Sequence, residues 1–294
     1  MEKIDREMAA SLLPQRRDES NKSDFGRVLS IAGSRNYRGA AYFSSVAPLR
    51  TGAGYVTLAG PEVALNDVSK AGVVTLPLKS RRGCVCGGSW KVIDRIVDGY
   101  DAVSIGCGLS LIRGIPSRLE RFFLRVILSL RRKEIPVVID ADGINLIASV
   151  CMEGPDISLP KKAILTPHPG EMSRLARITV AQVQDRRVEI AQEIAQRFSA
   201  VVVLKGKETV VTDGTNVFIN TTGSSALAKA GTGDVLTGII SGLCAQGLEP
   251  LAAGCLGVYL HGLAGEHAAR DCTEYGVLAE DVLDNIPAAI HALL

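Results

Sequence analysis

Short, continuously apolar runs alternate along this chain with longer segments of helical periodicity. Each run is followed by a cluster of Gly, Asp, Pro or Lys residues, so each ends where a loop begins. A strand that is apolar on both faces has to be buried on both faces, which is typical of parallel strands joined by right-handed crossovers. The sequence therefore predicts a doubly wound α/β sandwich with a mostly parallel sheet and helices on both faces. The predicted strands are residues 27–32, 55–59, 101–105, 136–139, 162–165 and 200–204.

The segments between these strands predict helices, and from residue 233 onward the chain is predicted to be wholly helical apart from its loops. Residues 209–212 and 217–220 flank an Asp213-Gly214 turn and predict an antiparallel hairpin appended to the sheet. The chain lacks a linker rich in Pro and Ser, so we expect one domain over residues 1–294. The clearest predicted helices are residues 1–17, 40–51, 117–132, 179–197, 233–247, 250–271 and 278–293.

Composition excludes several classes of function. The formal net charge is only +2, the arginine doublets are scattered, and 4% of the residues are aromatic, so we expect no nucleic-acid partner.

The uncharged stretches 235–248 and 251–265 are shorter than the ~17 residues of a membrane span, and no signal peptide is evident. Seven cysteines without a Cys-x-x-Cys pair indicate reduced thiols in the cytoplasm. The four histidines lack the spacing of a zinc site.

Polar residues are concentrated at the carboxyl ends of the predicted strands, where open parallel sheets bind their ligands. Lys229-Ala230-Gly231-Thr232-Gly233-Asp234 is the sharpest of these loops, because it leads directly into an apolar helix. Glycines there let backbone amides converge on a helix N-terminus, which favours a phosphate. Asp234 beside such an anion hole is suited to take a proton from an attacking hydroxyl. Spacing alone leaves open that Asp234 is simply an N-cap.

Several blocks of this sequence together resemble known proteins. The segment from Lys229 to Gly238 resembles the anion-hole motif of the ribokinase-like superfamily. More narrowly, five blocks resemble the NAD(P)H-hydrate dehydratase family, in matching order from about residue 20 to 290. The blocks are GRVLSIAGS with YRGAA (26–34, 37–41), DADGINL (140–146), LTPHPGEM (165–172), VLKGKET (203–209) and 228–238, and LHGLAG (260–265) also fits.

The resemblance implies a repair enzyme that restores NADH or NADPH from the hydrated form carrying a hydroxyl on carbon six of the nicotinamide. Members of the family phosphorylate the hydroxyl of the 6S epimer with ADP or ATP and then release phosphate. ADP is expected here because the loop resembles the prokaryotic branch, in which AMP is the product. Mg²⁺ is the expected cofactor, and related enzymes assemble as homo-oligomers, often tetramers.

The resemblance also implies roles for individual residues. Asp234 is expected to be the catalytic base and to contact the substrate. Ala40, Ala41, Gly108 and His168 are expected to bind the hydrated dinucleotide. The expected nucleotide-binding residues are Lys205, Gly206, Lys207, Glu208 and Thr209 in one loop and Gly231, Thr232 and Gly233 in the other.

Some roles stay open at the level of sequence. His168 lies between two prolines and could serve only to brace its loop. Asp140, Asp142 and Asn145 could be polar caps or ligands, and Glu171 could orient magnesium through water or cap a helix. The metal ligands are therefore unknown.

The chain departs from the family pattern at Gly106-Cys107-Gly108, where Gly-Pro-Gly is usual, and at Gly223-Ser224-Ser225, where Gly-Asn-Pro is common. Neither change removes a reactive group. We expect no epimerase domain. A vitamin or sugar kinase of the same superfamily is the main alternative, and a nucleotide-binding regulator without catalysis is another. The block around His168 argues against the first, and retention of Asp234 argues against the second.

Overall fold

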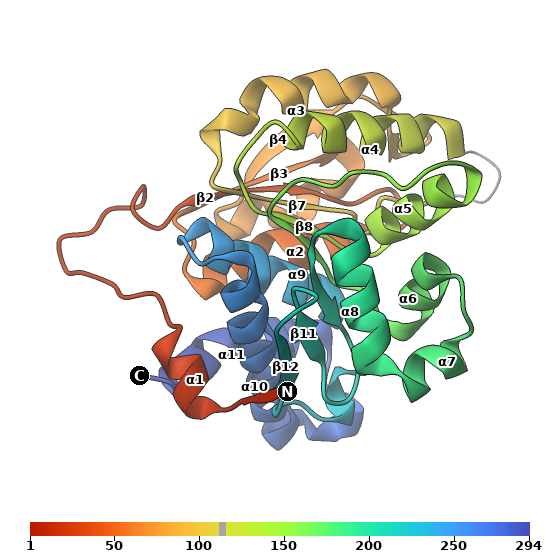
Figure 1. Cartoon of the computed structure of the whole chain (residues 1–294). Helices are drawn as coiled ribbons and strands as arrows, with labels where there is room; N and C mark the ends of the chain where they lie inside the picture. The colour runs from red at the N-terminus through yellow and green to blue at the C-terminus, as the bar shows by residue number, and fades with distance from the viewer. Residues whose placement is uncertain (112–115) are drawn as a thin grey trace.

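The structure is a computed structural model that describes residues 1–111 and 116–294. Ten strands of this part of the chain form one sheet, in the order β1-β12-β11-β10-β9-β8-β7-β2-β3-β4, between two layers of helices (Figure 1). The strands are β1 (Glu2–Ile4), β2 (Arg27–Ile31), β3 (Tyr55–Pro61), β4 (Val74–Leu78), β7 (Ala102–Ile105), β8 (Val137–Ile139), β9 (Ala163–Leu165), β10 (Val201–Leu204), β11 (Val210–Thr212) and β12 (Val217–Asn220). A separate two-stranded ribbon pairs β5 (Ser80–Arg81) with β6 (Cys84–Val85).

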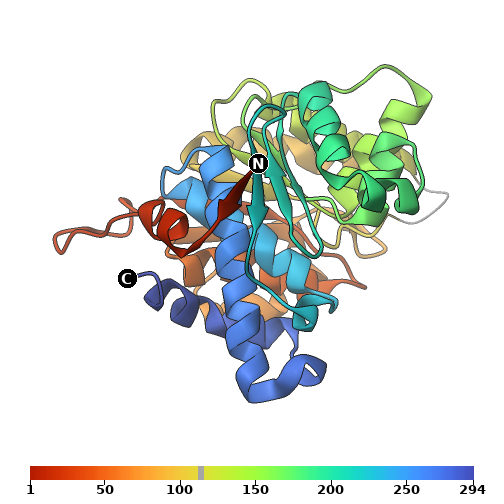
Figure 2. The same ribbon diagram turned by 60° about the horizontal axis from the view of Figure 1, so that its bottom comes forward.

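The sheet is parallel from β4 across to β10, as the buried apolar runs predict. The predicted hairpin is also confirmed, because β10, β11 and β12 pair antiparallel. The strand β1 was not predicted. It adds to the outer edge in parallel with β12, and Figure 2 shows the two side by side.

Helices cover the sheet on both faces, and a separate hydrophobic core lies under each layer. One layer consists of α2 (Arg38–Thr51), α9 (Thr232–Ala245), α10 (Pro250–Gly276) and α11 (Ala279–His291). The other consists of α3 (Trp90–Ile96), α4 (Pro116–Leu130), α5 (Asp142–Glu153), α6 (Pro169–Ala176), α7 (Val180–Asp185) and α8 (Arg187–Phe198). A short α1 (Arg6–Ser11) precedes β2. Short 3₁₀ helices lie at Glu62–Ala64, Asn66–Ala71, Gly87–Ser89, Val97–Gly99 and Ser225–Leu227.

Two helix predictions were wrong in their extent. The first helix ends at Ser11 rather than near residue 17, because Pro14 disfavours helical geometry in the residue before it. The single helix predicted over residues 179–197 is two helices, α7 and α8, that meet at Arg186 with φ −128° and ψ 40°. No residue between Val183 and Ile190 is buried, so packing does not hold the segment straight.

The remaining predicted helices are confirmed, including the helical finish of the chain in α9, α10 and α11. The α2 helix ends as expected at Gly52, whose φ of 113° suits a glycine in the left-handed region. Within the described residues, no helix is long and apolar enough to cross a membrane. The loops after β2, β7, β8, β9 and β10 emerge at one edge of the sheet, since these strands are parallel, and this edge holds the candidate site.

Candidate active site

The glycine-rich loop at residues 229–234 forms the start of α9. Gly231 is the N-cap, with φ 94°, and a Cβ there would lie 2.9 Å from side-chain atoms of both Phe43 and Ala279. Asp234 is the third residue of the helix, and the N-cap position belongs to Gly231. The N-cap interpretation of Asp234 is therefore wrong. Because first-turn amides lack partners within their own helix, the loop offers Gly233 and its neighbours as donors to an anion.

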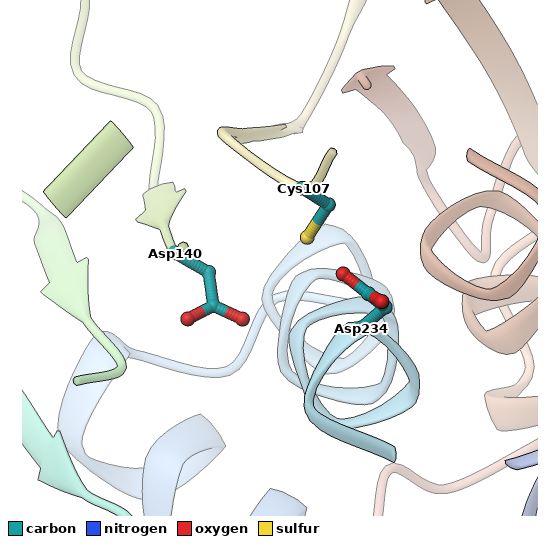
Figure 3. Close-up of side chains that lie close together, drawn as sticks. All are labelled: Cys107, Asp140 and Asp234. Atoms are coloured by element: carbon teal, nitrogen blue, oxygen red, sulfur yellow. The ribbon is translucent and has the colours of Figure 1, made fainter. Parts of the chain in front are cut away.

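Asp234 faces two groups that arrive from neighbouring strand ends, and Figure 3 shows the three side chains converging. Single ligand atoms of Cys107, Asp140 and Asp234 all lie within 4.8 Å of one another. Burial, followed by the charge of Asp140, raises the pKa of Asp234 to about 6. Burial and the charge of Asp234 raise the pKa of the Cys107 thiol well above its usual value, so the thiol stays protonated and donates to the Asp234 carboxylate. The arrangement leaves Asp234 more basic than an ordinary aspartate.

Asp140 follows β8 directly and is 1% exposed. Its Oδ1 lies 2.7 Å from Lys205 Nζ, and its Oδ2 accepts a hydrogen bond of 2.7 Å from Thr237 Oγ1 on α9. Burial works to lower the pKa of Lys205, but the carboxylates of Asp140 and Glu171 outweigh it and raise the pKa above its usual range. Lys205 is therefore a permanent positive charge at the centre of the site.

His168 is the N-cap of α6, and its Nδ1 accepts hydrogen bonds from the amides of Gly170 (2.9 Å) and Glu171 (3.3 Å). Glu171 returns the bond, because its Oε2 accepts from the His168 amide at 2.8 Å. Burial raises the pKa of Glu171 to about 7, and burial together with Lys205 and Arg174 lowers the pKa of His168. Helix capping thus explains the contacts of His168 Nδ1 and of the Glu171 carboxylate. The His168 ring is half-exposed, and its Nε2, which lies 3.3 Å from Glu171 Oε1, stays available to a ligand.

Asp142 and Asn145 connect the loops around the site. Asp142 Oδ2 accepts from the Ser110 amide at 2.7 Å, and Asn145 Oδ1 accepts from Arg174 Nε at 2.8 Å. Burial raises the pKa of Asp142. Between them and Asp140, Ala141 adopts φ 49°, which is strained for a residue with a side chain. The two side chains thus have structural partners, and strain is stored beside Asp140.

The N-terminal end of α2 closes the site on another side. Gly108 has φ 62°, and a Cβ there would lie 2.7 Å from the Cβ atoms of both Ala40 and Tyr37. Ala40 and Gly108 are therefore in direct contact at the rim. Ala41 is fully buried next to Gly33, so its side chain belongs to the core.

The loop from Lys205 to Thr209 runs from the centre of the site toward the outer edge of the sheet. Lys207 and Glu208 are exposed and line a cavity of about 430 Å³ that also includes Arg187. Arg187 Nη2 donates to the carbonyl oxygen of Leu204 at 2.9 Å and fixes the start of the loop. The predicted nucleotide-binding residues are thus divided between the centre (Lys205, Gly233) and this peripheral cavity.

Comparison with known proteins decides the family. The sequence matches the NAD(P)H-hydrate dehydratase family over residues 28–288. The chain belongs to this family. Among curated relatives, it is 31% identical to the ADP-dependent (S)-NAD(P)H-hydrate dehydratase of Bacillus subtilis, covering 96% of this chain and 95% of the relative. It is 37% identical to the bifunctional NAD(P)H-hydrate repair enzyme Nnr of Moorella thermoacetica, again over 96% of this chain. The chain spans about half (52%) of the length of that relative.

Solved structures similar to this chain have the same fold. The ADP/ATP-dependent NAD(P)H-hydrate dehydratase of B. subtilis, co-crystallised with ATP and Mg²⁺, superposes with a TM-score of 0.84 at 29% identity and covers 100% of this chain and 99% of its own. A ribokinase-like superfamily protein of Enterococcus faecalis gives 0.85 at 26% identity, with coverage of 100% and 96%. The predicted ribokinase-like fold is confirmed.

Two residues of the candidate site were not singled out as site residues from the sequence. Thr237 bonds to Asp140, and His261 on α10 donates from Nε2 to the Thr232 carbonyl oxygen at 2.9 Å. Burial lowers the pKa of His261 to about 4, so the ring is neutral. His261 thereby fixes the start of α9. Thr237 lies in the block at 228–238 and His261 in the block LHGLAG, but both are inside helices rather than in the loops where ligands were expected.

Proposed function

We propose that this chain dehydrates the (6S) hydrates of NADH and NADPH, with ADP as phosphoryl donor and AMP and phosphate as by-products. One observation carries the proposal: Asp234, with its raised pKa, lies at the N-terminus of α9 beside the ammonium-bearing Lys205 loop. A base next to two independent anion-binding elements suits phosphoryl transfer to a hydroxyl. The similarity to the ADP-dependent dehydratase of B. subtilis and to the repair enzyme of Moorella supports the same reaction.

In the first step, Asp234 takes the proton of the carbon-six hydroxyl as its oxygen attacks the β-phosphorus of ADP. The bond from this phosphorus to the bridging oxygen breaks, and AMP leaves. Amides of residues 231–233 and the Lys205 ammonium bind the transferred group and stabilise its charge. A pKa of about 6 keeps Asp234 ionised at neutral pH while making it a stronger base than an ordinary aspartate.

In the second step, the lone pair of the ring nitrogen forms a double bond to carbon six as the carbon–oxygen bond breaks and phosphate leaves. Loss of a proton from carbon five then restores the dihydronicotinamide. Phosphorylation is needed because hydroxide is a poor leaving group and phosphate a good one. The chain has to hold the ring near Asp234, and we propose that Ala40, Ala41, Gly108 and the Nε2–H of His168 do so.

Mg²⁺ is expected in phosphoryl transfer, but the side chains at the centre do not form a set of ligands for it. Both oxygens of Asp140 already have partners, and the Cys107 thiol is too soft a ligand for this ion. Mg²⁺ commonly binds through substrate phosphates, so we propose that it arrives on the nucleotide. The idea that Glu171 orients it through water stays a prediction.

We further propose that the peripheral cavity near Lys207 and Glu208 takes the adenosine end of the nucleotide, which leaves its phosphates near Lys205 and Gly233. We also propose cytoplasmic action as a homo-oligomer, with a tetramer as the expected state. The seven cysteines, all within the described residues, are unpaired. Tyr42, Phe43 and Leu49 of α2 line an open cavity of about 810 Å³, which supports an interface on this helix.

Incubation with hydrated NADH and ADP tests the proposal. We expect the absorbance of reduced nicotinamide to rise in step with AMP and free phosphate, one of each per turnover. Asp234→Asn is the control and should slow all three signals on the order of a hundredfold or more. A stable phosphorylated product without recovered NADH would instead favour a small-molecule kinase, and absence of turnover with both ADP and ATP would refute the proposal.

A further inference from the structure

Asp140 joins two parts of the molecule that are far apart in sequence. Its Oδ1 pairs with Lys205 Nζ at 2.7 Å, and its Oδ2 accepts from Thr237 Oγ1 on α9 at 2.7 Å. Its side chain is 2% exposed, so water competes little for either bond. Because both oxygens have partners, the carboxylate is held in one orientation and is not free to act as a base.

These bonds place the Lys205 ammonium against the start of α9. A Cβ built on Gly233 would lie 3.3 Å from Lys205 Nζ, and Glu171 Oε2 lies 3.9 Å from the same atom. The ammonium therefore shares one space with the first-turn amides of the helix. A cation and a helix N-terminus both favour an anion, and a phosphoryl oxygen in that space would contact both.

We propose that Asp140 is a positioning residue that holds Lys205 in the anion hole, so that the ammonium contacts the phosphoryl group in transfer. The family resemblance assigns Lys205 to the nucleotide and gives Asp140 no defined role. The inference rests on the proposed phosphoryl transfer at this site. It adds what keeps the Lys205 ammonium in contact with the transferred group.

Asp140 also acts on the base through its charge. The groups that act on Asp234 come from three loops: Cys107 after β7, Asp140 and Asp142 after β8, and Lys205 after β10. After burial, Asp140 has the largest effect that raises the pKa of Asp234, Lys205 lowers it, and Asp142 raises it least. Loss of Asp140 and loss of Lys205 should therefore move the acid limb of the activity profile in opposite directions.

Asp140→Asn tests the inference, with Asp142→Asn as the matched control from the same loop. The readouts are KM for ADP and the pH profile of kcat/KM, which reports groups of the free enzyme. We expect Asp140→Asn to raise KM for ADP about tenfold or more, as is usual when a buried charge pair loses one partner. Its acid limb should move to lower pH. Asp142→Asn should leave KM for ADP within about twofold, because the amide oxygen of the substituted side chain can still accept from the Ser110 amide.

Lys205→Met provides a second test that does not depend on how well Asp140→Asn folds. It should also raise KM for ADP, but its acid limb should move to higher pH. An unchanged KM for ADP in Asp140→Asn would overturn the positioning role, because Lys205 would then reach the phosphoryl group without its partner. Absence of turnover by the wild-type chain would refute the proposed function instead, so the two failures are distinguishable.

Discussion

Asp234→Asn should make the protein more stable while it slows turnover strongly. The pKa of Asp234 is raised from 3.8 to about 6, so the folded protein binds this proton more tightly than the unfolded chain does. The folded state is therefore most stable relative to the unfolded chain at low pH, where Asp234 is protonated. Stability is lost as the pH rises from about 4 to about 6 and stays reduced above that. Asparagine carries no charge and removes this loss.

The structure sets the size of the effect. A rise in pKa from 3.8 to about 6 lowers the unfolding free energy of the wild type above pH 6 by about 3 kcal/mol, and Asp234→Asn should recover this amount. This is an upper limit, because the N-terminus of α9 partly stabilises a negative charge at its third residue. For a chain of 294 residues, 3 kcal/mol is about 5 °C in melting temperature. Removal of a positioned base should also lower kcat on the order of a hundredfold or more.

The change in stability can be measured by thermal unfolding of the wild type and of Asp234→Asn. Circular dichroism would follow unfolding at about pH 7.5 and at about pH 4. The variant should melt higher at the upper pH, and the difference should nearly vanish at the lower one. Asp271→Asn, an exposed carboxylate on α10, is the matched control and should show no such difference. Equal melting temperatures at the upper pH, or wild-type turnover by the variant, would refute the reasoning.

Three further predictions follow from the contacts. His168→Ala should lose about 1 kcal/mol of unfolding free energy because it removes an N-cap, whereas His168→Asn keeps the cap and should lose only substrate affinity. Urea unfolding and KM measure the two effects, and equal destabilisation of both variants would contradict this prediction. Gly108→Ala should lower the unfolding free energy by roughly 1–3 kcal/mol, because φ is 62° and the new methyl group would meet Ala40 and Tyr37. An unchanged midpoint of urea unfolding would contradict this. Light scattering should give a multiple of the monomer mass, and Phe43→Glu on α2 should reduce it; a strictly monomeric wild type would exclude the oligomer.

The sequence was sufficient to predict the central sheet because burial on both faces leaves a strand few choices of residue. Val201–Leu204 is apolar at every position and buried at every position. The same logic predicts where the site lies, since parallel strands bring Asp140, Lys205 and the start of α9 to one edge. The strand β1 was missed because only Ile4 of its three residues is buried, so it carries no such pattern.

Pairing within the site could not be predicted, because it depends on distances between loops rather than on composition. Lys205 and Asp140 are 65 residues apart, and Thr237 lies 97 residues from Asp140. Cys107 was identified only as a departure from the family pattern, although its thiol contacts the Asp234 carboxylate. The strained φ of Ala141 likewise follows from the tertiary arrangement of the loop, which a single sequence does not show.

The central claim is that the carbon-six hydroxyl is phosphorylated before it leaves, and labelling its oxygen tests this most directly. Hydrated NADH carrying heavy oxygen at this hydroxyl would be incubated with ADP and the wild-type chain, and the released phosphate and water would be examined by mass spectrometry. The proposed mechanism breaks the carbon–oxygen bond only after the oxygen has bonded to phosphorus. We therefore predict the label in inorganic phosphate, one heavy oxygen per NADH restored. Label found in water, with NADH recovered at the same rate, would contradict phosphoryl transfer to the substrate.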